Sequence, residues 1–136
     1  MELNILLNED AERGMAQSGL TTSRAGLLWE VFHRGPVTQR VLSEALKVTS
    51  RNITGLVDGL VQTGFVTREP HPTDRRATLV TLTEHGKATG LTMFQQQQEF
   101  ASTLFGDFAA GELDTLVAGL DKVLARLRGV VLAQPD

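Results

Sequence analysis

Residues able to perform covalent or metal chemistry are few in this 136-residue chain. It contains no cysteine, which excludes disulfides, thiolate catalysis and cysteine-based redox sensing. The histidines His33, His71 and His85 are scattered, without the close spacing that a zinc site requires, and no Ser-His-Asp order or glycine-rich phosphate loop is present. An enzyme built on His33 or His85 would need convergent polar groups, which the sequence does not offer. We therefore expect neither an enzyme nor a bound metal or cofactor.

Side chains suited to hydrogen bonding with nucleic-acid bases cluster near the middle of the chain. Ser50, Arg51 and Asn52 supply a hydroxyl, a guanidinium and an amide in consecutive positions, and apolar residues follow at helical spacing. Such donors and acceptors distinguish base edges in the major groove of DNA. Gly55 follows, where it lets a helix backbone approach DNA at a cost of ~1 kcal/mol in helix propensity. The segment predicts a recognition helix.

A second cationic group lies between two short strand-like segments. Arg75 and Arg76 occupy a polar, proline-containing stretch, and arginines on such a loop can enter a narrow minor groove. Asp74 beside them is unsuited to contact DNA, so we expect it to pair with an arginine and hold the loop. His71 either contacts phosphate, reports pH or is simply solvated.

Charge is unevenly distributed along the chain. Between Arg34 and Arg76 there are seven basic and four acidic residues, a balance of +3 within a chain whose net charge is −3, so the remainder carries −6. A basic middle between acidic ends is typical of a DNA-binding module held by scaffolding helices, although chance clustering gives the same pattern.

Helical segments surround the predicted recognition helix. We expect a first helix over 3–15 and a second from a cap at Thr22 or Ser23 to about 33, stopped by Gly35-Pro36. Thr38 caps a third helix, whose predicted buried residues are Val41, Leu42, Ala45 and Leu46. The recognition helix covers 50–62 and ends at a left-handed Gly64. Its predicted buried residues are Ile53, Leu56, Val57, Leu60 and Val61.

The pattern then alternates, which predicts strands over 65–68 and 78–82 joined as a hairpin. Two short helices followed by this hairpin form a winged helix-turn-helix, in a fold that is mainly α with a small β-wing. Such a motif places one helix in the major groove, about 12 Å wide. The chain start lacks a basic leader segment and no apolar run approaches the ~18 residues of a membrane span, so we expect a cytoplasmic protein without a membrane partner.

Two long helices complete the prediction, one capped by Thr83 and reaching about 105, the other covering 111–132. Apolar residues of the last helix recur in steps of three and four: Leu113, Leu116, Leu120, Val123, Leu127 and Val130. These stripes pack either within one chain or between two. The apolar stripe of the last helix is long, and one small winged domain has too little surface to bury both long helices. We therefore favour a homodimer, which would place two recognition helices ~34 Å apart.

Three segments resemble the MarR family of regulators. The run Thr73-Asp74-Arg75-Arg76-Ala77 followed by Leu82-Thr83-Glu84-His85-Gly86 is similar to that family's wing, and 50–60 with Gly64-Phe65-Val66 is similar to its recognition helix. Leu20-Thr21-Thr22-Ser23 resembles the entry to its second helix. The N-terminal segment is short for the family, and Gly55 and Gly59 stand at positions that are often basic in relatives.

This resemblance implies a single domain over 1–136, with a DNA-binding lobe at 20–88 and a helical dimerisation lobe from 1–19 and 89–136. It implies a homodimer on a pseudo-palindromic double-stranded operator, and repression relieved by a small organic effector. Carried over by position, the residues that face the major groove are Ser50, Arg51, Asn52, Thr54 and Gly55. Arg75 and Arg76 would enter the minor groove with Asp74 as the loop's tie, and Thr38 and Gln39 would hold phosphates.

Trp29 and His33 lie four residues apart on the second helix, where relatives often line a ligand cleft. They either bind an aromatic or phenolic effector or pack in the core or dimer seam. A constitutive DNA binder without effector is an alternative to a ligand-responsive repressor. A winged-helix protein-interaction module, with an incidental basic patch, is the alternative to a DNA-binding regulator.

Overall fold

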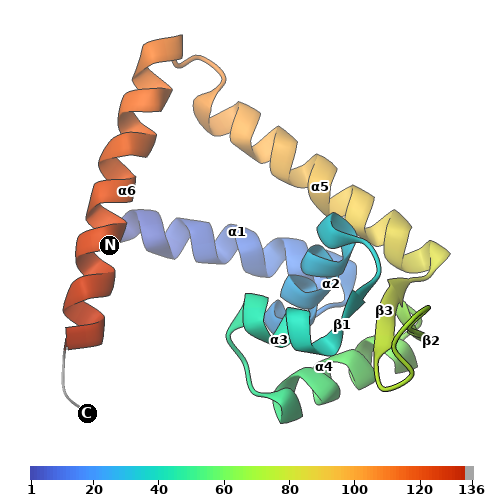
Figure 1. Ribbon diagram of the computed structural model, residues 1–136. Helices are drawn as coiled ribbons and strands as arrows, with labels where there is room; N and C mark the ends of the chain where they lie inside the picture. The colour runs from blue at the N-terminus through green and yellow to red at the C-terminus, as the bar shows by residue number, and fades with distance from the viewer. Residues whose placement is uncertain (134–136) are drawn as a thin grey trace. The chain divides into compact units, whose positions relative to one another are not determined.

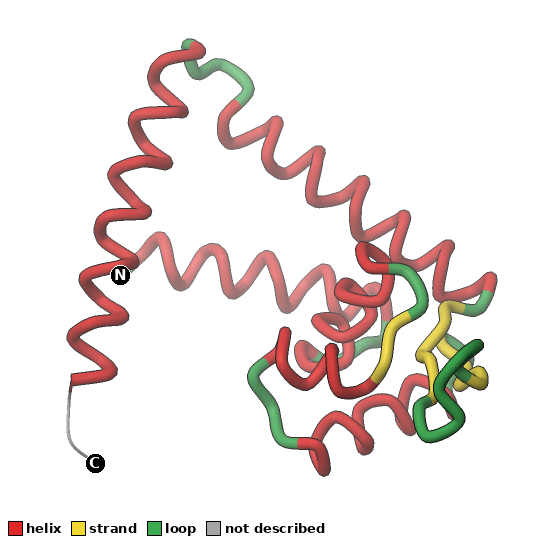
Figure 2. Tube along the Cα trace, in the orientation of Figure 1, coloured by secondary structure: helices red, strands yellow, loops and turns green. Residues whose placement is uncertain are grey.

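The computed structural model describes residues 1–133, which form six helices and one small sheet (Figure 1; Figure 2). The elements in chain order are α1 (Glu2–Ser18), α2 (Thr22–Arg34), β1 (Val37–Thr38), α3 (Gln39–Leu46), α4 (Ser50–Gln62), β2 (Val66–Pro70), β3 (Thr78–Leu82), α5 (Glu84–Phe105) and α6 (Ala110–Ala133). This confirms the predicted mainly α fold with a β-wing. The chain divides into two compact units, residues 1–95 and the remainder, with the division inside α5. The expected lobes at 20–88 and at 1–19 with 89–136 stay a prediction.

Threonine side chains begin three consecutive helices. The Oγ1 atoms of Thr21, Thr38 and Thr49 accept hydrogen bonds from backbone N–H groups three residues later, at 3.3, 3.3 and 3.1 Å. Each bond satisfies a donor that the first turn of a helix leaves free. The cap of α3 confirms the prediction, whereas the expected cap of α2 at Thr22 or Ser23 is wrong. Thr22 is already helical, and Thr21 has the extended backbone of a capping residue.

A tight turn joins α3 to α4. Lys47 ends α3 with a φ of 54°, the one non-glycine residue with positive φ among residues 1–133. This conformation lets Val48 N–H donate to the Ser43 carbonyl at 3.1 Å, and Thr49 then caps α4 directly. The two helices are thereby held as a helix-turn-helix.

Gly64 ends α4 as predicted. Its φ of 84° reverses the chain, so that Gly64 N–H donates to Val61 O at 3.1 Å and Phe65 N–H donates to Leu60 O at 2.9 Å. This pair of bonds is a Schellman motif, which satisfies the last carbonyl groups of the helix. It turns the buried Phe65 into the core and starts β2.

The sheet has the order β1-β3-β2 and is antiparallel throughout. The sequence did not indicate β1, because a strand of two residues is too short to show the alternation of apolar and polar residues that predicts a strand. The first predicted strand, 65–68, is displaced, since β2 runs on to Pro70, which pairs with Thr78. We expected Pro70 in the loop, but an edge strand tolerates a residue without an N–H group.

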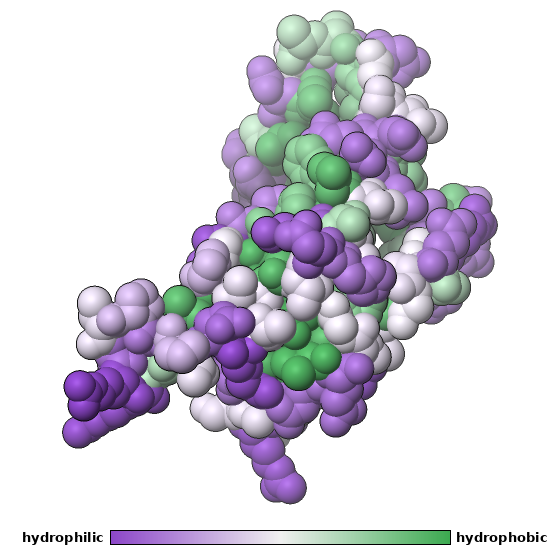
Figure 3. Space-filling view, turned by 90° about the vertical axis from the view of Figure 1, so that its right-hand side faces the viewer, coloured by the Kyte–Doolittle hydropathy of each residue, from purple (hydrophilic) through white to green (hydrophobic). Residues whose placement is uncertain are grey.

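The core lies between α2, α3, α4 and the sheet. Its buried apolar residues are Leu20, Ala25, Leu27, Leu28, Val31, Val37, Leu42, Ile53, Val57, Leu60, Phe65, Val66 and Val80. Val41 and Val61 were expected in it, but each is 37% exposed. Adjacent helical residues point about 100° apart, so burial of Leu42 and Leu60 turns their neighbours toward the surface. Figure 3 views the molecule from the side of the wing and the start of α5, where hydrophobic patches lie among hydrophilic side chains.

The first turns of α5 pack unusually close to the winged motif. Thr83 Oγ1 accepts from Gly86 N–H at 3.0 Å, which confirms the predicted cap, and donates to Gly64 O at 2.6 Å. A Cβ on Gly86 would overlap the carbonyl oxygen of Phe65, and one on Gly90 would overlap the ring of Phe32. The two glycines therefore allow α5 to lie against α2 and against Phe65, which directly precedes β2.

The apolar stripe of α6 is exposed. Within this unit, Leu116, Leu120, Val123, Leu127 and Val130 are 38–59% exposed, and α6 has no buried residue. Although α6 is about six turns long, its apolar side chains pack against few other side chains within their own unit. Among residues 1–133, no helix has the length and apolar character to cross a membrane.

Candidate nucleic-acid interface

The polar side of α4 forms a continuous exposed surface. Ser50, Arg51, Asn52, Thr54 and Gly55 are all exposed, and we call this set the recognition surface. A Cβ on Gly55 would meet no atom within 4 Å, so the helix backbone is accessible there. The opposite side of α4 carries the buried Ile53, Val57 and Leu60. The helix is therefore anchored by one face and presents hydrogen-bonding groups on the other.

A polar network supports the recognition surface from behind. Gln39 Nε2 donates to Thr54 Oγ1 at 3.2 Å, and Arg68 Nε donates to Gln39 Oε1 at 3.0 Å. Arg68 also forms an ion pair with Asp58 at 2.6 Å. Because the network joins α3, α4 and β2, it holds the recognition helix in a defined position relative to the wing.

Sequence reasoning missed this network. Arg68 contributed to the basic balance of the central segment, but its charge is compensated by Asp58. Residues 39 and 68 lie 29 positions apart, and no local pattern relates them. Arg34 and Arg40 are likewise paired, with Glu30 and Glu44. The central cations without an ion pair among residues 1–133 are Lys47, Arg51, Arg75 and Arg76.

Thr38 and Gln39 stand at the start of α3. The hydroxyl oxygen of Thr38 accepts from Val41 N–H, so its own hydrogen stays available as a donor. Gln39 is half-buried and both ends of its amide are engaged by Thr54 and Arg68. A phosphate contact by Gln39 would have to compete with these bonds, and its role as a phosphate ligand stays a prediction.

The wing tip, residues 71–77, is organised by hydrogen bonds to the backbone. Asp74 Oδ1 accepts from Arg76 N–H at 2.9 Å, and Asp74 O accepts from Ala77 N–H at 3.2 Å. We expected Asp74 to pair with an arginine side chain, which is wrong within residues 1–133: the aspartate ties the loop through the arginine's backbone. The guanidinium groups of Arg75 and Arg76 are thereby left exposed for a ligand.

His71 also holds the wing tip. Its Nδ1 accepts from Asp74 N–H at 3.0 Å and from Thr73 N–H at 3.2 Å, and its backbone N–H donates to Ala77 O at 3.3 Å. None of the alternatives weighed from the sequence included this turn-capping role. A histidine three residues before the aspartate of an Asp-Arg-Arg tip is the signal that could have suggested it.

Trp29 and His33 belong to an aromatic cluster on α2 and α5. Their ring centroids are 4.1 Å apart, and His33 Nδ1–H donates to Trp29 O at 2.9 Å. Phe94 lies 6.5 Å from Trp29 and 6.3 Å from His33, and Phe32 lies 6.4 Å from Trp29. The predicted effector residues are thus brought together, in contact with other rings, and their ligand-binding role stays a prediction.

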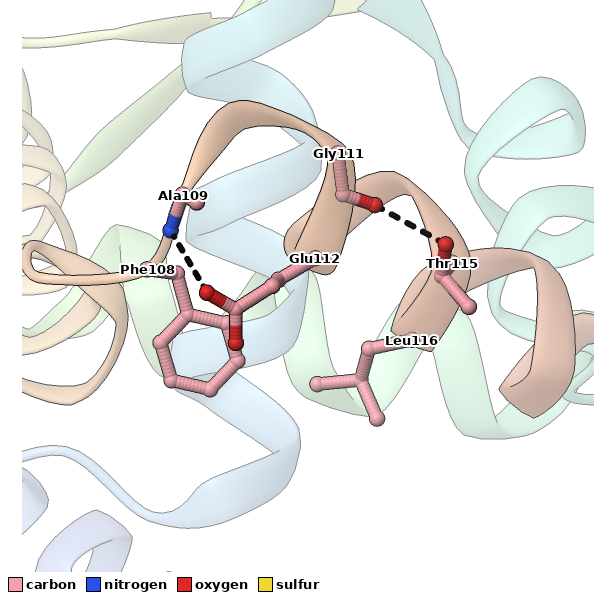
Figure 4. Close-up of a pocket in the computed structure, with 6 residues that line it drawn as sticks. All are labelled: Phe108, Ala109, Gly111, Glu112, Thr115 and Leu116. Atoms are coloured by element: carbon pink, nitrogen blue, oxygen red, sulfur yellow. Dashed lines mark hydrogen bonds between the residues drawn. The ribbon is translucent and has the colours of Figure 1, made fainter.

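The turn between α5 and α6 has an apolar hollow of about 690 Å³ lined by Phe108, Ala109, Gly111, Glu112, Thr115 and Leu116 (Figure 4). Glu112 accepts from Ala109 N–H at 3.1 Å and Thr115 Oγ1 donates to Gly111 O at 2.9 Å. These bonds are the local caps of α6. Because the polar side chains of the hollow already form these bonds, it offers few hydrogen-bonding groups that could orient a ligand.

Comparisons with known proteins agree with this geometry. A MarR family model matches residues 18–77. The chain is 31% identical over 125 residues to the HTH-type transcriptional repressor YetL of Bacillus subtilis, covering 89% of this chain and 74% of YetL. It is 27% identical over 128 residues to the transcriptional activatory protein BadR of Rhodopseudomonas palustris, covering 90% and 73%. It spans about two thirds to three quarters of the curated relatives it first matches.

A solved structure of Streptococcus pneumoniae FabT in complex with DNA has the same fold, with a TM-score of 0.80, 17% identity and coverage of 94% of this chain and 93% of FabT. The family match covers the helix-turn-helix, β2 and the wing tip, and ends just before β3. The chain therefore belongs to the MarR family of winged helix-turn-helix transcriptional regulators.

Proposed function

We propose that this regulator is a homodimeric repressor that binds a pseudo-palindromic operator. The observation that carries the proposal is the recognition surface of α4, exposed and supported by the network of Gln39 and Arg68, together with the exposed Arg75 and Arg76 of the wing, which form no ion pair among residues 1–133. Ser50, Arg51 and Asn52 contact base edges in the major groove, and the wing arginines enter the flanking minor groove. Thr38 and Gln39 contact the phosphate backbone.

Dimerisation is supported by the exposed apolar stripe of α6. Leucine and valine side chains that are 38–59% exposed along one helix are unusual for a monomer in water. Burial of such a stripe against a second copy removes it from solvent and gives the dimer two recognition surfaces. A two-fold protein in turn requires a two-fold operator.

Repression is supported by likeness to YetL, which is named a repressor, although BadR is named an activatory protein. An aromatic or phenolic effector at Trp29 and His33 releases the operator in this proposal. The ring cluster supports it, because an aromatic ligand can stack on rings that already pack at 4.1–6.5 Å.

The test is fluorescence anisotropy of the full chain on DNA from its own upstream region and on scrambled DNA, across a salt series. We expect selective binding with a steep salt dependence, and a salt slope reduced by about 2 in the Arg75→Ala/Arg76→Ala variant. Arg13→Ala/Lys122→Ala, which removes the same charge outside the recognition surface and the wing, is the matched control. Equal binding to both DNAs, or equal slopes in the two variants, would refute the proposal.

A winged-helix module that binds protein is the second candidate. It is favoured by the negative net charge and by the compensation of Arg34, Arg40 and Arg68 through internal ion pairs. It predicts weak DNA binding that hardly changes with salt and is insensitive to the wing arginines. The same anisotropy series therefore separates the two.

A further inference from the structure

Arg24, in the first turn of α2, lies over the backbone of α4. A Cβ on Gly59 would stand 2.6 Å from Nη2, 2.7 Å from Cζ and 2.7 Å from Nε of Arg24. Because these three distances are nearly equal, that position lies above the face of the guanidinium plane rather than at its edge. Gly59 is buried although it lies toward the polar side of α4, since the arginine covers it.

Contact through the face leaves the donors of Arg24 available. The five N–H groups of a guanidinium point outward in its plane, so a backbone beneath the plane engages none of them. Among residues 1–133, the half-buried side chain of Arg24 forms neither an ion pair nor a hydrogen bond. Its charge does not stabilise α2 either, because the dipole of a helix disfavours a cation in the first turn. An ordered guanidinium with available N–H groups therefore stands beside α4.

The guanidinium of Arg24 borders the recognition surface. Gly59 follows Gly55 by four residues, so the two glycines lie on one stripe of α4, about one turn apart. Asp58, which pairs with Arg68, points about 100° away from Gly59 around the helix. Arg24 and Arg68 thus flank α4 on different sides. Among residues 1–133, the charge of Arg68 is compensated and that of Arg24 is not.

DNA in contact with the recognition surface would bring phosphate close to Arg24. A helix with its side chains is about 10–12 Å across and the major groove is about 12 Å wide, so the phosphates of both strands stand beside a helix in the groove. The edge of a guanidinium binds two phosphate oxygens through parallel N–H···O bonds. Because Gly59 has no side chain, the cation lies closer to α4 than a side chain at position 59 would allow.

We infer that Arg24 is a further DNA-binding residue, which contacts a backbone phosphate at the edge of the major groove, and that Gly59 provides the space that places its guanidinium there. The inference rests on the proposed DNA binding, but not on dimerisation, repression or an effector. Because a phosphate contact carries no sequence information, Arg24 holds the helix in the groove without selecting bases.

The test is fluorescence anisotropy of the full chain on DNA from its own upstream region and on scrambled DNA, across a potassium chloride series. Arg24→Met removes the charge and keeps an unbranched side chain, and Arg13→Met removes the same charge from an exposed residue of α1. We expect Arg24→Met to weaken binding to both DNAs at least about fivefold and to reduce the salt slope by about 1 per bound protomer. Arg13→Met should change neither quantity.

Gly59→Ala separates this contact from a purely structural role of Arg24. The new methyl group takes the space of the guanidinium, which can move because it ends a flexible side chain. We expect a urea midpoint equal to or above that of the wild type at the same protein concentration, since alanine favours a helix. Binding and salt slope should nevertheless fall as in Arg24→Met. In the Arg24→Met background, Gly59→Ala should have no further effect on binding.

An unchanged salt slope in Arg24→Met refutes the phosphate contact, even where affinity falls. Additive losses from Arg24→Met and Gly59→Ala refute the role of Gly59, because the methyl group would then obstruct DNA itself. An Arg24-dependent slope in a chain that does not distinguish the two DNAs supports the contact and refutes the proposed repressor. Binding that does not change with salt in the wild type refutes both.

Discussion

Replacement of Gly86 by alanine should destabilise the winged motif, against the ordinary preference of helices. Gly86 lies in the first turn of α5, where its Cα faces the carbonyl oxygen of Phe65. An added Cβ would overlap that oxygen, and the oxygen cannot rotate away because it also accepts from Thr83 N–H at 3.1 Å. Leu82 Cδ2, 3.2 Å from the same Cβ position, closes the site further.

Two effects of opposite sign determine how much Gly86→Ala changes the free energy of unfolding. Overpacking against a fixed backbone costs about 3 kcal/mol, at the upper end of the usual range. Exchange of glycine for alanine within a helix contributes up to ~1 kcal/mol in the other direction. The net expectation for Gly86→Ala is a loss of about 2 kcal/mol in the free energy of unfolding.

The assay is urea unfolding at a fixed protein concentration, because dimerisation would make stability depend on concentration. Gly55→Ala is the matched control: the same substitution in a helix, at a position where the new Cβ meets no atom within 4 Å. Its free energy of unfolding should rise by up to ~1 kcal/mol. A Gly86→Ala variant as stable as Gly55→Ala would refute the packing argument.

Three further outcomes are expected. Arg51→Ala should weaken operator binding by about 1–3 kcal/mol and relax base preference at one position, and an equal loss on scrambled DNA would contradict base contact. Leu120→Glu should convert the dimer to a monomer in analytical ultracentrifugation and abolish operator binding; a monomer that binds the operator normally would contradict the dimer. Asp58→Asn removes the partner of Arg68 and leaves its cation uncompensated, so affinity for operator and scrambled DNA should rise alike. The free energy of unfolding should change by less than about 1 kcal/mol, because both side chains are partly solvated. A loss of affinity for the operator alone would contradict this expectation, because it would mean that the position of α4 depends on the Asp58–Arg68 pair more than on the bonds of Gln39.

Local signals were sufficient for most of the secondary structure. Thr38, Thr83 and Gly64 act through hydrogen bonds that span three to five residues, so their sequence neighbours suffice to predict the start of α3, the start of α5 and the end of α4. The wrong predictions, the cap of α2 and the burial of Val41 and Val61, are each displaced by only one residue along the chain or by one step around a helix. Thr21 and Thr22 are equally suitable caps by type, and Val41 and Val61 sit at the margin of their apolar stripes.

The residues of the candidate site were predicted from the sequence, but the hydrogen bonds and the ion pair that hold them in place were not. The exposed face of α4 follows from helical periodicity once Ile53, Val57 and Leu60 are assigned to the core. The roles of Gln39, Arg68 and His71 did not follow. Each depends on which atoms face one another after the hairpin has folded against α3 and α4.

The sequence by itself determined the order of the helices and of the two wing strands, the caps of α3 and α5, the basic centre and the polar face of the recognition helix, because these depend on residue type and on spacing within a turn or two. The tertiary structure decided which cations are compensated: Arg68 pairs with Asp58, whereas Arg75 and Arg76 are exposed and form no ion pair among residues 1–133. It also decided that the guanidinium of Arg24 lies over Gly59. Ion pairs and contacts of this kind arise between segments that are distant in the sequence, where composition and periodicity contain no information about which side chains will meet.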